Sequence, residues 1–285
     1  MNIRAKTALI TGASRGIGRA IALEFAQQGV KKLLLVARSQ QRLAEVAAEV
    51  EAWGVEAVIL PLDLTQPVAV NVAIAQAWRD HGPFHLLVNC AGVAYQTPFL
   101  NSNLLNVQAE LETNLMGMYT ITSLVARRMV AQQSGTIINV SSLMGKVAAP
   151  TMATYSATKF AILGFTQALR SELAAHGVRV VAFLPSLTDT DMVKNFQLFR
   201  WMKPISTAKV AKALVIGLRQ ESPEILVDWQ SRLALWCGRI APWLLELIVR
   251  WAAPSPQPTA PLRQPISINL FKHSATASEQ PYQQL

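Results

Sequence analysis

Residues 7–18, TALITGASRGIG, decide the fold of this chain. The stretch begins as a short apolar run, typical of a buried strand, and continues into IGRAIALEFAQQG, which has the spacing of an amphipathic helix. Gly12, Gly16 and Gly18 fall at the turn between the two. Glycines permit the turn, a close approach of the backbone to a diphosphate and tight helix packing, while the helix N-terminus favours an anion. A glycine-rich turn with a purely structural purpose is the weaker alternative, so the stretch predicts a dinucleotide-binding unit.

The alternation of strand and helix continues as far as residue 228. Further apolar runs expected to be strands lie at 32–38, 56–65, 84–92, 135–142, 178–185 and 224–228. Helix-period segments lie between them, among others at 39–54, 111–130, 155–177 and 205–220, the last with Ser206 or Thr207 as N-cap. This order predicts an α/β domain over residues 1–228: a doubly wound, Rossmann-like parallel sheet flanked by helices and joined by right-handed crossovers.

The rhythm changes after residue 190. Residues 191–204 are aromatic and Met-rich without a clear period, which indicates a mobile loop or a short helix. Residues 229–253 are expected to form one amphipathic helix with a large apolar face. The tail, 254–285, is polar and contains prolines, which favours disorder.

Composition limits the classes of partner. The net charge is +9, and from Lys194 onward eleven Lys/Arg stand against five Asp/Glu. The chain has no recognised nucleic-acid motif, so an anionic cofactor or an anionic membrane surface is the better explanation of the excess. Two cysteines without a CxxC pair, and four scattered histidines, predict neither a disulfide framework nor a metal site. The N-terminus does not resemble a signal peptide, and a reducing, cytoplasmic location is expected.

Charge near the predicted cofactor site indicates which nicotinamide cofactor is bound. An NAD site usually has an acidic residue at the end of the second strand, for the ribose 2′-hydroxyl. Here that strand ends at Arg38 with no carboxylate, and Ser14 and Arg15 lie inside the glycine loop. Two guanidiniums and a hydroxyl suit a 2′-phosphate, which favours NADP(H). The alternative is that both arginines are ordinary solvated surface residues.

At this point the chain resembles the short-chain dehydrogenase/reductase superfamily, over about residues 4–228. The motifs that carry the resemblance follow the family's order: TGASRGIG at 11–18, NCAG at 89–92, TNLMGMY at 113–119, NVSSLMG at 139–145, YSATK at 155–159 and LPSLTDTDM at 184–192. The resemblance implies an oxidoreductase with a catalytic tetrad of Asn114, Ser142, Tyr155 and Lys159. It also implies cofactor contacts from Gly12, Ser14, Arg15, Gly16, Ile17, Gly18, Arg38, Asp63, Asn89, Gly92, Tyr155, Lys159, Pro185 and Thr190.

The YSATK segment also makes chemical sense by itself. A carbonyl that takes a hydride needs a proton, and tyrosine, with a pKa of about 10, is a weak acid near neutrality. Lys159 lies four residues after Tyr155, on the same helix face, and an ammonium there is expected to lower the pKa of the phenol. Ser142, at the end of a predicted strand, can hydrogen-bond the substrate carbonyl; Ser141 competes for this role, and the family spacing favours Ser142.

The remaining roles are implied by the resemblance alone. Lys159 would hold the nicotinamide ribose, and Asn114 would order a water that relays protons to the lysine, unless it is simply a buried amide bonded to backbone. Asp63 would hydrogen-bond the adenine edge. Asn89 would fix either the sheet or the cofactor's ribose, and Thr190 would bind the nicotinamide carboxamide.

Two positions depart from the family pattern. Ser186 follows Pro185 where the family usually has glycine, so the loop over the nicotinamide is expected to be stiffer or differently placed. Cys90 replaces the second Asn of the family's NNAG motif, and we expect no redox role for it.

The 229–252 segment is the feature that the family does not explain. Its tryptophans and arginines suit a helix in a membrane interface, whereas its charges and Pro242 argue against a spanning helix. Packing over the substrate cleft, or against a second subunit, remains equally open at this point. The family usually forms homo-oligomers through helix pairs that include the Tyr155 helix, so a homo-oligomer is expected.

These observations predict an NADPH-dependent carbonyl reductase that acts on a lipophilic ketone, aldehyde or secondary alcohol. A 3-oxoacyl-(acyl carrier protein) reductase is the alternative, because a basic surface suits an acidic carrier protein, although that class generally lacks a long apolar C-terminal extension. A non-catalytic NADPH-binding scaffold is a third hypothesis, disfavoured because the whole tetrad is present.

Overall fold

The computed structural model describes residues 1–200 and 202–254 of the 285-residue chain. The predicted disorder of the tail therefore lies outside the described residues, except at Pro254. Residues Met1–Pro254 form one compact unit.

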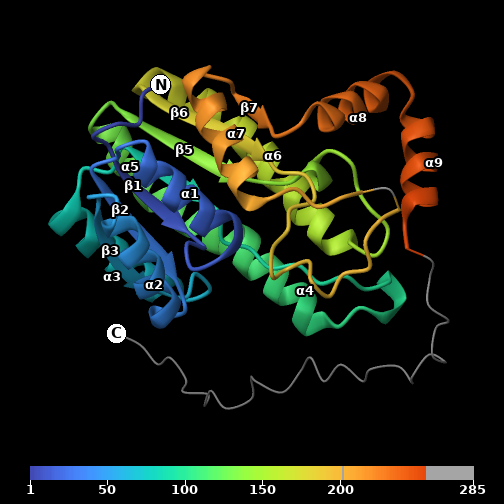
Figure 1. The fold of residues 1–285 in the computed structure, drawn as a ribbon, viewed down its shortest axis with the longest axis horizontal. Coiled ribbons are helices and arrows are strands. Elements are labelled where there is room, and N and C mark those ends of the chain that lie inside the picture. Colours follow the sequence, from blue (N-terminus) through green and yellow to red (C-terminus); the bar gives the residue numbers. More distant parts are fainter. Residues whose placement is uncertain (201, 255–285) are drawn as a thin grey trace, which may run out of the picture. The chain divides into compact units, whose positions relative to one another are not determined.

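The core of this unit is a seven-stranded sheet in which every strand is parallel to its neighbours (Figure 1). The strands are β1 (Thr7–Thr11), β2 (Lys32–Ala37), β3 (Glu56–Pro61), β4 (Leu86–Asn89), β5 (Gly135–Val140), β6 (Val178–Leu184) and β7 (Glu224–Leu226). Their spatial order is β3-β2-β1-β4-β5-β6-β7, so the chain reverses its direction of growth between β1 and β4. Ligands of such sheets bind at the carboxyl ends of the strands, at this reversal.

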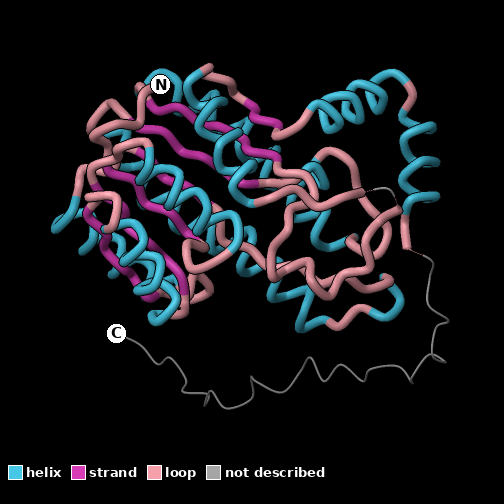
Figure 2. Tube along the Cα trace, viewed as in Figure 1, coloured by secondary structure: helices cyan, strands magenta, loops and turns pink. Residues whose placement is uncertain are grey.

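Helices cover both faces of the sheet, as the tube in Figure 2 also shows. The α-helices are α1 (Gly16–Gln27), α2 (Gln40–Glu51), α3 (Pro67–His81), α4 (Leu104–Leu111), α5 (Met118–Ala131), α6 (Ala153–Leu173), α7 (Thr207–Arg219), α8 (Trp229–Ile240) and α9 (Pro242–Ala252). Short 3₁₀ turns lie at Phe99–Asn101, Leu143–Gly145 and Ala174–His176, and a π-helical turn at Glu112–Gly117.

Two apolar clusters hold the three layers together. One is built from the sheet with α1, α2 and α7, and the other from the sheet with α3 and α5. The central strands are buried on both faces, which explains why they read as continuous Leu, Ile and Val runs in the sequence, whereas the edge strand β3 is only half-buried. The predicted Rossmann-like, doubly wound parallel sheet is thus confirmed. Ser206 is the N-cap of α7, with its hydroxyl accepting from the Lys209 N–H at 3.3 Å.

Two helices differ from the prediction. The 111–130 segment is α5 preceded by the π-helical turn, and α4 begins seven residues earlier than expected, at Leu104. The single helix expected over 229–253 is wrong: α8 ends at Ile240, and α9 begins at Pro242. Ala241 takes φ −135° and ψ 72°, because a residue before proline is excluded from the α region and proline has no N–H to continue the helix.

The loop between β6 and α7 contains no helix in its described residues; turns occupy 191–196, and Figure 2 draws this stretch as loop. Among the described residues, no helix combines the length and the apolarity needed to cross a bilayer.

Candidate active site

The glycine loop lies between β1 and α1, at the reversal point of the sheet. Gly12 has φ +67° and Gly16 φ +57°, backbone conformations that favour glycine. A Cβ on Gly12 would come within 2.8 Å of the Ala91 Cα, and one on Gly18 would overlap the Gly12 carbonyl oxygen. These glycines therefore let α1 approach β1, and let the loop approach the end of β4.

The N-terminus of α1 is suited to an anion. Arg15, the N-cap residue, makes no side-chain cap, and the first turn contains no acidic residue, so the first amide N–H groups of the helix are open to a ligand. The Thr11 hydroxyl accepts from the Cys90 N–H at 3.0 Å and the Ala91 N–H at 3.1 Å, which joins the ends of β1 and β4 beneath this opening. Such an arrangement fits a dinucleotide diphosphate.

The residues predicted to choose the cofactor lie around the same loop. Arg38 directly follows β2, is exposed, and has no ion pair among the described residues. Arg15 is exposed as well, and its guanidinium lies 3.7 Å from the Asp191 carboxylate. Ser14 is half-buried in the loop. Asp63, after β3, accepts from the Thr65 N–H at 3.0 Å and the Thr65 hydroxyl at 2.9 Å, both through Oδ1.

Asn89 has a structural set of contacts. It is only 4% exposed, and its amide donates to the Thr122 hydroxyl and to Asn139 Oδ1, each at 2.8 Å. The Asn139 amide in turn donates to the Thr166 hydroxyl at 2.9 Å. Of the two roles left open for Asn89, these bonds favour fixing the sheet to α5 and α6.

The other predicted cofactor residues also reach this edge. A Cβ on Gly92 would lie 3.2 Å from Asn114 Oδ1, and a Cβ on Gly16 would lie 3.3 Å from the Thr190 methyl group. Pro185 follows β6, and its carbonyl accepts from the Leu143 N–H at 2.9 Å. Ile17 is half-buried in the first turn of α1. The loop after β6 thus comes back over the glycine loop.

Tyr155 and Lys159 lie on α6, against the end of β5. Lys159 is 5% exposed, and its ammonium donates to the Val140 carbonyl at 3.0 Å and lies 5.4 Å from the centre of the Tyr155 ring. The Ser142 hydroxyl lowers the pKa of the Tyr155 phenol beside it, and it caps the turn that follows β5, accepting from the Met144 N–H at 3.1 Å. Ser141 is instead buried and donates to the Lys159 carbonyl at 2.8 Å, so Ser142 is the serine beside the phenol.

The electrostatics of this pair differ from the expectation. Burial raises the pKa of Tyr155 to about 12; the bond to Ser142 lowers it less than burial raises it, and the Glu110 and Cys90 charges raise it further. The prediction that Lys159 lowers this pKa is wrong, because Lys159 is not among the groups that shift it. The physical reason is that the ammonium is itself buried, which lowers the pKa of Lys159 to about 8, and that it bonds to a backbone carbonyl rather than to the phenol.

Asn114 lies in the π-helical turn and is 1% exposed. Its Oδ1 accepts from the Val93 N–H at 2.8 Å, and its amide donates to the Val93 carbonyl at 2.9 Å and to the Thr158 hydroxyl at 3.2 Å. Asn114 thereby connects the segment after β4 to α6, one residue before Lys159. The bonds to backbone that were the simpler alternative for Asn114 are present, and they place it beside the lysine.

Cys90 is half-buried beside the same cluster. Desolvation raises the pKa of its thiol to about 12, so the reactive thiolate is scarce. Within the described residues, no group of three or more potential metal-ligating side chains was found.

Two residues at the site, Glu110 and Gly145, were missed by sequence reasoning. Glu110, one turn before Asn114, is a buried carboxyl; it was detectable because it falls on the inward face of a helix, where carboxyls are rare. A Cβ on Gly145 would come within 2.7 Å of the Lys159 carbonyl, so glycine is needed for α6 to approach the turn. Ser186, where the family usually has glycine, donates to Asp228 Oδ2 at 2.7 Å and ties the loop after β6 to α8.

The comparisons with known proteins agree with this geometry. The model of the short chain dehydrogenase family matches residues 6–200. A ketoacyl reductase of Nostoc sp. is 32% identical over 255 residues, covering 86% of this chain and 88% of that protein. A 3-oxoacyl-[acyl-carrier-protein] reductase of Synechocystis sp. is 38% identical over 193 residues, covering 68% and 78%.

Solved structures show the same fold. The crystal structure of a short chain dehydrogenase from Burkholderia cenocepacia, in complex with NADP, has a TM-score of 0.77 and 27% sequence identity, and the match covers 89% of this chain and all of that one. Both the family match and the alignment to the Nostoc reductase extend over most of the chain. This chain therefore belongs to the short chain dehydrogenase family of oxidoreductases.

Proposed function

We propose that this protein is an NADPH-dependent carbonyl reductase that acts on a lipophilic ketone or aldehyde, or on the corresponding secondary alcohol in reverse. The observation that carries the proposal is the meeting of Ser142, Tyr155, Lys159 and Asn114 beside an open glycine loop. Bound NADPH supplies the hydride that reaches the carbonyl carbon.

Side chains of the protein would hold the proton and transfer it to the substrate. Tyr155 holds a proton at its phenol oxygen at neutral pH, because its pKa is raised to about 12, and this proton is the one that the developing alkoxide would receive. The Ser142 hydroxyl, at the end of β5 beside that phenol, would donate to the carbonyl oxygen. The reaction consumes one hydride and one proton and yields the alcohol. Lys159 lies on the same helix as Tyr155, 5.4 Å from the centre of its ring, and Asn114 bonds to the neighbouring Thr158.

The preference for NADPH rests on charge. Arg38 follows β2 where an NAD-binding protein usually has a carboxylate, and Arg15 lies in the glycine loop beside it. The structure of the Burkholderia relative contains NADP, which supports the same choice for this chain. The Arg15–Asp191 ion pair spans the two segments that would enclose the cofactor, and an exposed pair of this kind exchanges partners at little cost.

A specific observation also favours the second candidate, a 3-oxoacyl thioester reductase. The Nostoc and Synechocystis relatives are named for that reaction, and the net charge of +9 suits an acidic carrier protein. Both candidate functions reduce a carbonyl with NADPH, and they differ in the molecule that carries the carbonyl group.

We also propose two contacts beyond the substrate. Large apolar side chains are exposed along the α4–α6 region, which suits a homo-oligomer; they are Leu104, Leu105, Leu111, Met116, Tyr119 and Phe160. Exposed tryptophans and arginines on α8 and α9 suit a peripheral contact of residues 229–252 with an anionic membrane surface, in a protein that otherwise resides in the cytoplasm.

The test of the function is NADPH oxidation, followed at 340 nm, over a panel of carbonyl compounds. The panel compares apolar ketones and aldehydes with 3-oxoacyl groups carried on coenzyme A and on acyl carrier protein. Tyr155→Phe, which keeps the ring and removes the proton, is expected to lower kcat by 10³-fold or more, roughly the upper part of the range for general acid catalysis. Activity that survives this change would refute the mechanism, and a wild type that binds NADPH but reduces no member of the panel would favour the scaffold hypothesis.

A further inference from the structure

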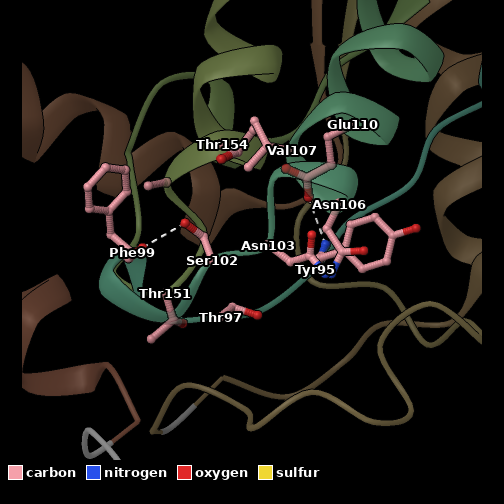
Figure 3. Close-up of a pocket in the computed structure, with 11 residues that line it drawn as sticks. Tyr95, Thr97, Phe99, Ser102, Asn103, Asn106, Val107, Glu110, Thr151 and Thr154 are labelled. Atoms are coloured by element: carbon pink, nitrogen blue, oxygen red, sulfur yellow. Dashed lines mark hydrogen bonds between the residues drawn. The ribbon is translucent and has the colours of Figure 1, made fainter. Parts of the chain in front are cut away.

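The feature of interest is the buried carboxyl of Glu110 on α4. Its residue surface is only 2% exposed, and its Oε1 accepts from the Tyr95 N–H at 2.7 Å, the bond drawn in Figure 3. Carboxyls are almost never buried to this degree unless something pairs with them. One backbone N–H is a small compensation for a buried charge, so a further partner is to be expected.

Glu110 and Asn114 are four residues apart on the same helical stretch, so they lie on one face, a turn from each other. Both bind the same extended segment after β4. Asn114 bonds to the N–H and carbonyl of Val93, and Glu110 bonds to the N–H of Tyr95. The two side chains therefore act as a double clamp on residues 93–95, the segment that continues directly from the end of β4.

The charge of Glu110 reaches the catalytic pair. Burial raises the pKa of Tyr155 and lowers that of Lys159, and the Glu110 carboxylate raises the pKa of both, acting on Lys159 less than Cys90 does. Burial also raises the pKa of Glu110 itself, whereas the bond from the Tyr95 N–H and the charge of Lys159 lower it. Lys159 has no carboxylate within 4.0 Å in the described part of the chain, so its countercharge acts through space. The titratable side chains near Glu110 are Tyr95 and Cys90, which follow β4, and Tyr155 and Lys159 on α6.

The carboxyl also borders a small hollow. The hollow lies between α4, the segment 95–102 and the start of α6, and Figure 3 shows the Glu110 side chain at its edge, near Tyr95 and Asn106. Its other lining groups include the polar side chains of Ser102, Asn103 and Thr154. An amide in place of the carboxyl keeps an oxygen that can accept from the Tyr95 N–H, so the charge can be removed without changing the shape of the side chain.

We propose that Glu110 is a positioning residue of the active site: it supplies the negative countercharge of the Tyr155–Lys159 pair and, with Asn114, clamps residues 93–95. This inference rests on the proposed reductase function. Glu110, a residue outside the tetrad, would then balance the positive charge of Lys159. The consequence is that the pH range of activity depends on Glu110, because the countercharge favours the protonated forms of both Tyr155 and Lys159.

The test compares Glu110→Gln with Glu110→Leu and with the control Glu112→Gln. Gln keeps an oxygen for the Tyr95 N–H and removes the charge, whereas Leu removes both. Glu112 lies two residues away, is only half-buried, and accepts from Gln108 at 2.6 Å. The readout is the pH profile of kcat/KM for carbonyl reduction at saturating NADPH.

We expect Glu110→Gln to move the alkaline limb of that profile to lower pH, by roughly half a pH unit or more, because removing a nearby negative charge makes the phenol a stronger acid. Glu112→Gln is expected to leave the limb in place. Glu110→Leu is expected to move the limb as Gln does and, in addition, to raise KM, because residues 93–95 lose a clamp. An unshifted limb in Glu110→Gln would overturn the proposal, even if its kcat fell.

A second readout needs no activity and separates this inference from the proposed function. The unfolding free energy of Glu110→Gln is compared in the wild-type background and in the Lys159→Met background. If the carboxylate balances Lys159, the substitution is more destabilising when the lysine is present. Equal effects in the two backgrounds would overturn the countercharge, whatever reaction the protein catalyses.

Discussion

The carboxyl edge of the sheet and the α8–α9 segment differ in whether their side chains bond to other parts of the chain or face solvent. At the carboxyl edge, the buried groups bond to one another: Thr11 to the end of β4, Asn114 to Val93, and Lys159 to β5. On α8 and α9, the tryptophans point to solvent, and Trp229, Trp243 and Trp251 are each 69% exposed. One region is fixed from within, and the other has surface that nothing in the described chain covers.

The α8–α9 segment is attached at its two ends. At its start, Asp228 caps α8, accepting from the Ser231 N–H at 2.7 Å, and also accepts from the Ser186 hydroxyl at 2.7 Å. At its finish, the Ala252 carbonyl accepts from the Arg200 N–H at 2.8 Å. Both anchors belong to the loop that follows β6. The comparison teaches that the carboxyl edge is specified by local packing, whereas α8 and α9 are held at their ends and keep apolar surface that no described residue covers.

The largest expected effect lies in the glycine loop. Gly18→Ala places a methyl group against the Gly12 carbonyl oxygen, which is backbone and has no freedom to rotate away. We expect a loss of about 3 kcal/mol of unfolding free energy, at the upper end of the usual cost of overpacking. The measurement is urea unfolding followed by circular dichroism.

Gly164→Ala is the matched control for this prediction. Gly164 is a helical glycine on α6, and a Cβ there would meet nothing within 4 Å. The same chemical change should therefore stabilise the protein by up to about 1 kcal/mol, because alanine is the better helix former. If both alanine variants unfolded alike, the close contact between α1 and β1 would be wrong.

The second prediction concerns the stability cost of the catalytic lysine. The folded-state pKa of Lys159 is about 8, below its ordinary 10.5, so folding disfavours its charged form. At pH 7 that cost is about 3 kcal/mol, from which about 1 kcal/mol is subtracted for the bond to the Val140 carbonyl. Lys159→Met is therefore expected to stabilise the protein by about 2 kcal/mol while removing its activity.

The sign of the pH dependence provides the control. Between pH 8 and 10.5 the unfolded lysine holds a proton that the folded lysine has lost, so wild-type stability rises with pH in this window relative to Lys159→Met. The advantage of the variant should shrink from pH 7 to pH 10. A gap that stayed constant would mean that the lysine is not desolvated as the structure indicates.

The contrast between the two regions also explains which parts of the structure could be predicted from the sequence. The sheet and the closeness of Tyr155 and Lys159 on one helix could be predicted because several local signals agree there: apolar strands, the glycine loop, and the four-residue spacing of the two side chains. The raised pKa of Tyr155 could not, because it depends on burial and on Glu110, which is distant in sequence from the phenol it affects. The break in the last helix was signalled by Pro242, but the apolar pattern on both sides of it suggested one helix.

The third prediction tests the cofactor end of the catalytic edge. Arg38→Asp replaces a positive charge with the acidic residue that an NAD site carries, and it should lower the NADPH/NADH ratio of kcat/KM by about 100-fold, or about 3 kcal/mol of differential binding. Lys31→Asp is the control, since Lys31 directly precedes β2 and Arg38 directly follows it. The two positions lie at opposite ends of one strand, so only Arg38 should alter the ratio. A similar fall in both variants would point to overall charge rather than to a 2′-phosphate site.

The smallest effect on stability, and the sharpest test of the contrast, comes from the outer helices. Trp236 and Trp243 are 61% and 69% exposed, so changing both to serine should alter the unfolding free energy by less than about 1 kcal/mol. If this face meets an anionic membrane surface, the double variant should co-sediment less with vesicles containing phosphatidylserine, and the wild type should bind neutral phosphatidylcholine vesicles more weakly.

Trp53→Ser is the matched control for the outer helices, because Trp53 follows α2 and is 57% exposed without belonging to an apolar face of α8 or α9. Its vesicle binding should equal that of the wild type. Equal pelleting of all three proteins would exclude the membrane, and a change in oligomer size with the double variant would then assign the face to a second copy of the chain. Either result would identify what covers the apolar face of α8 and α9, which the amphipathic pattern alone cannot name.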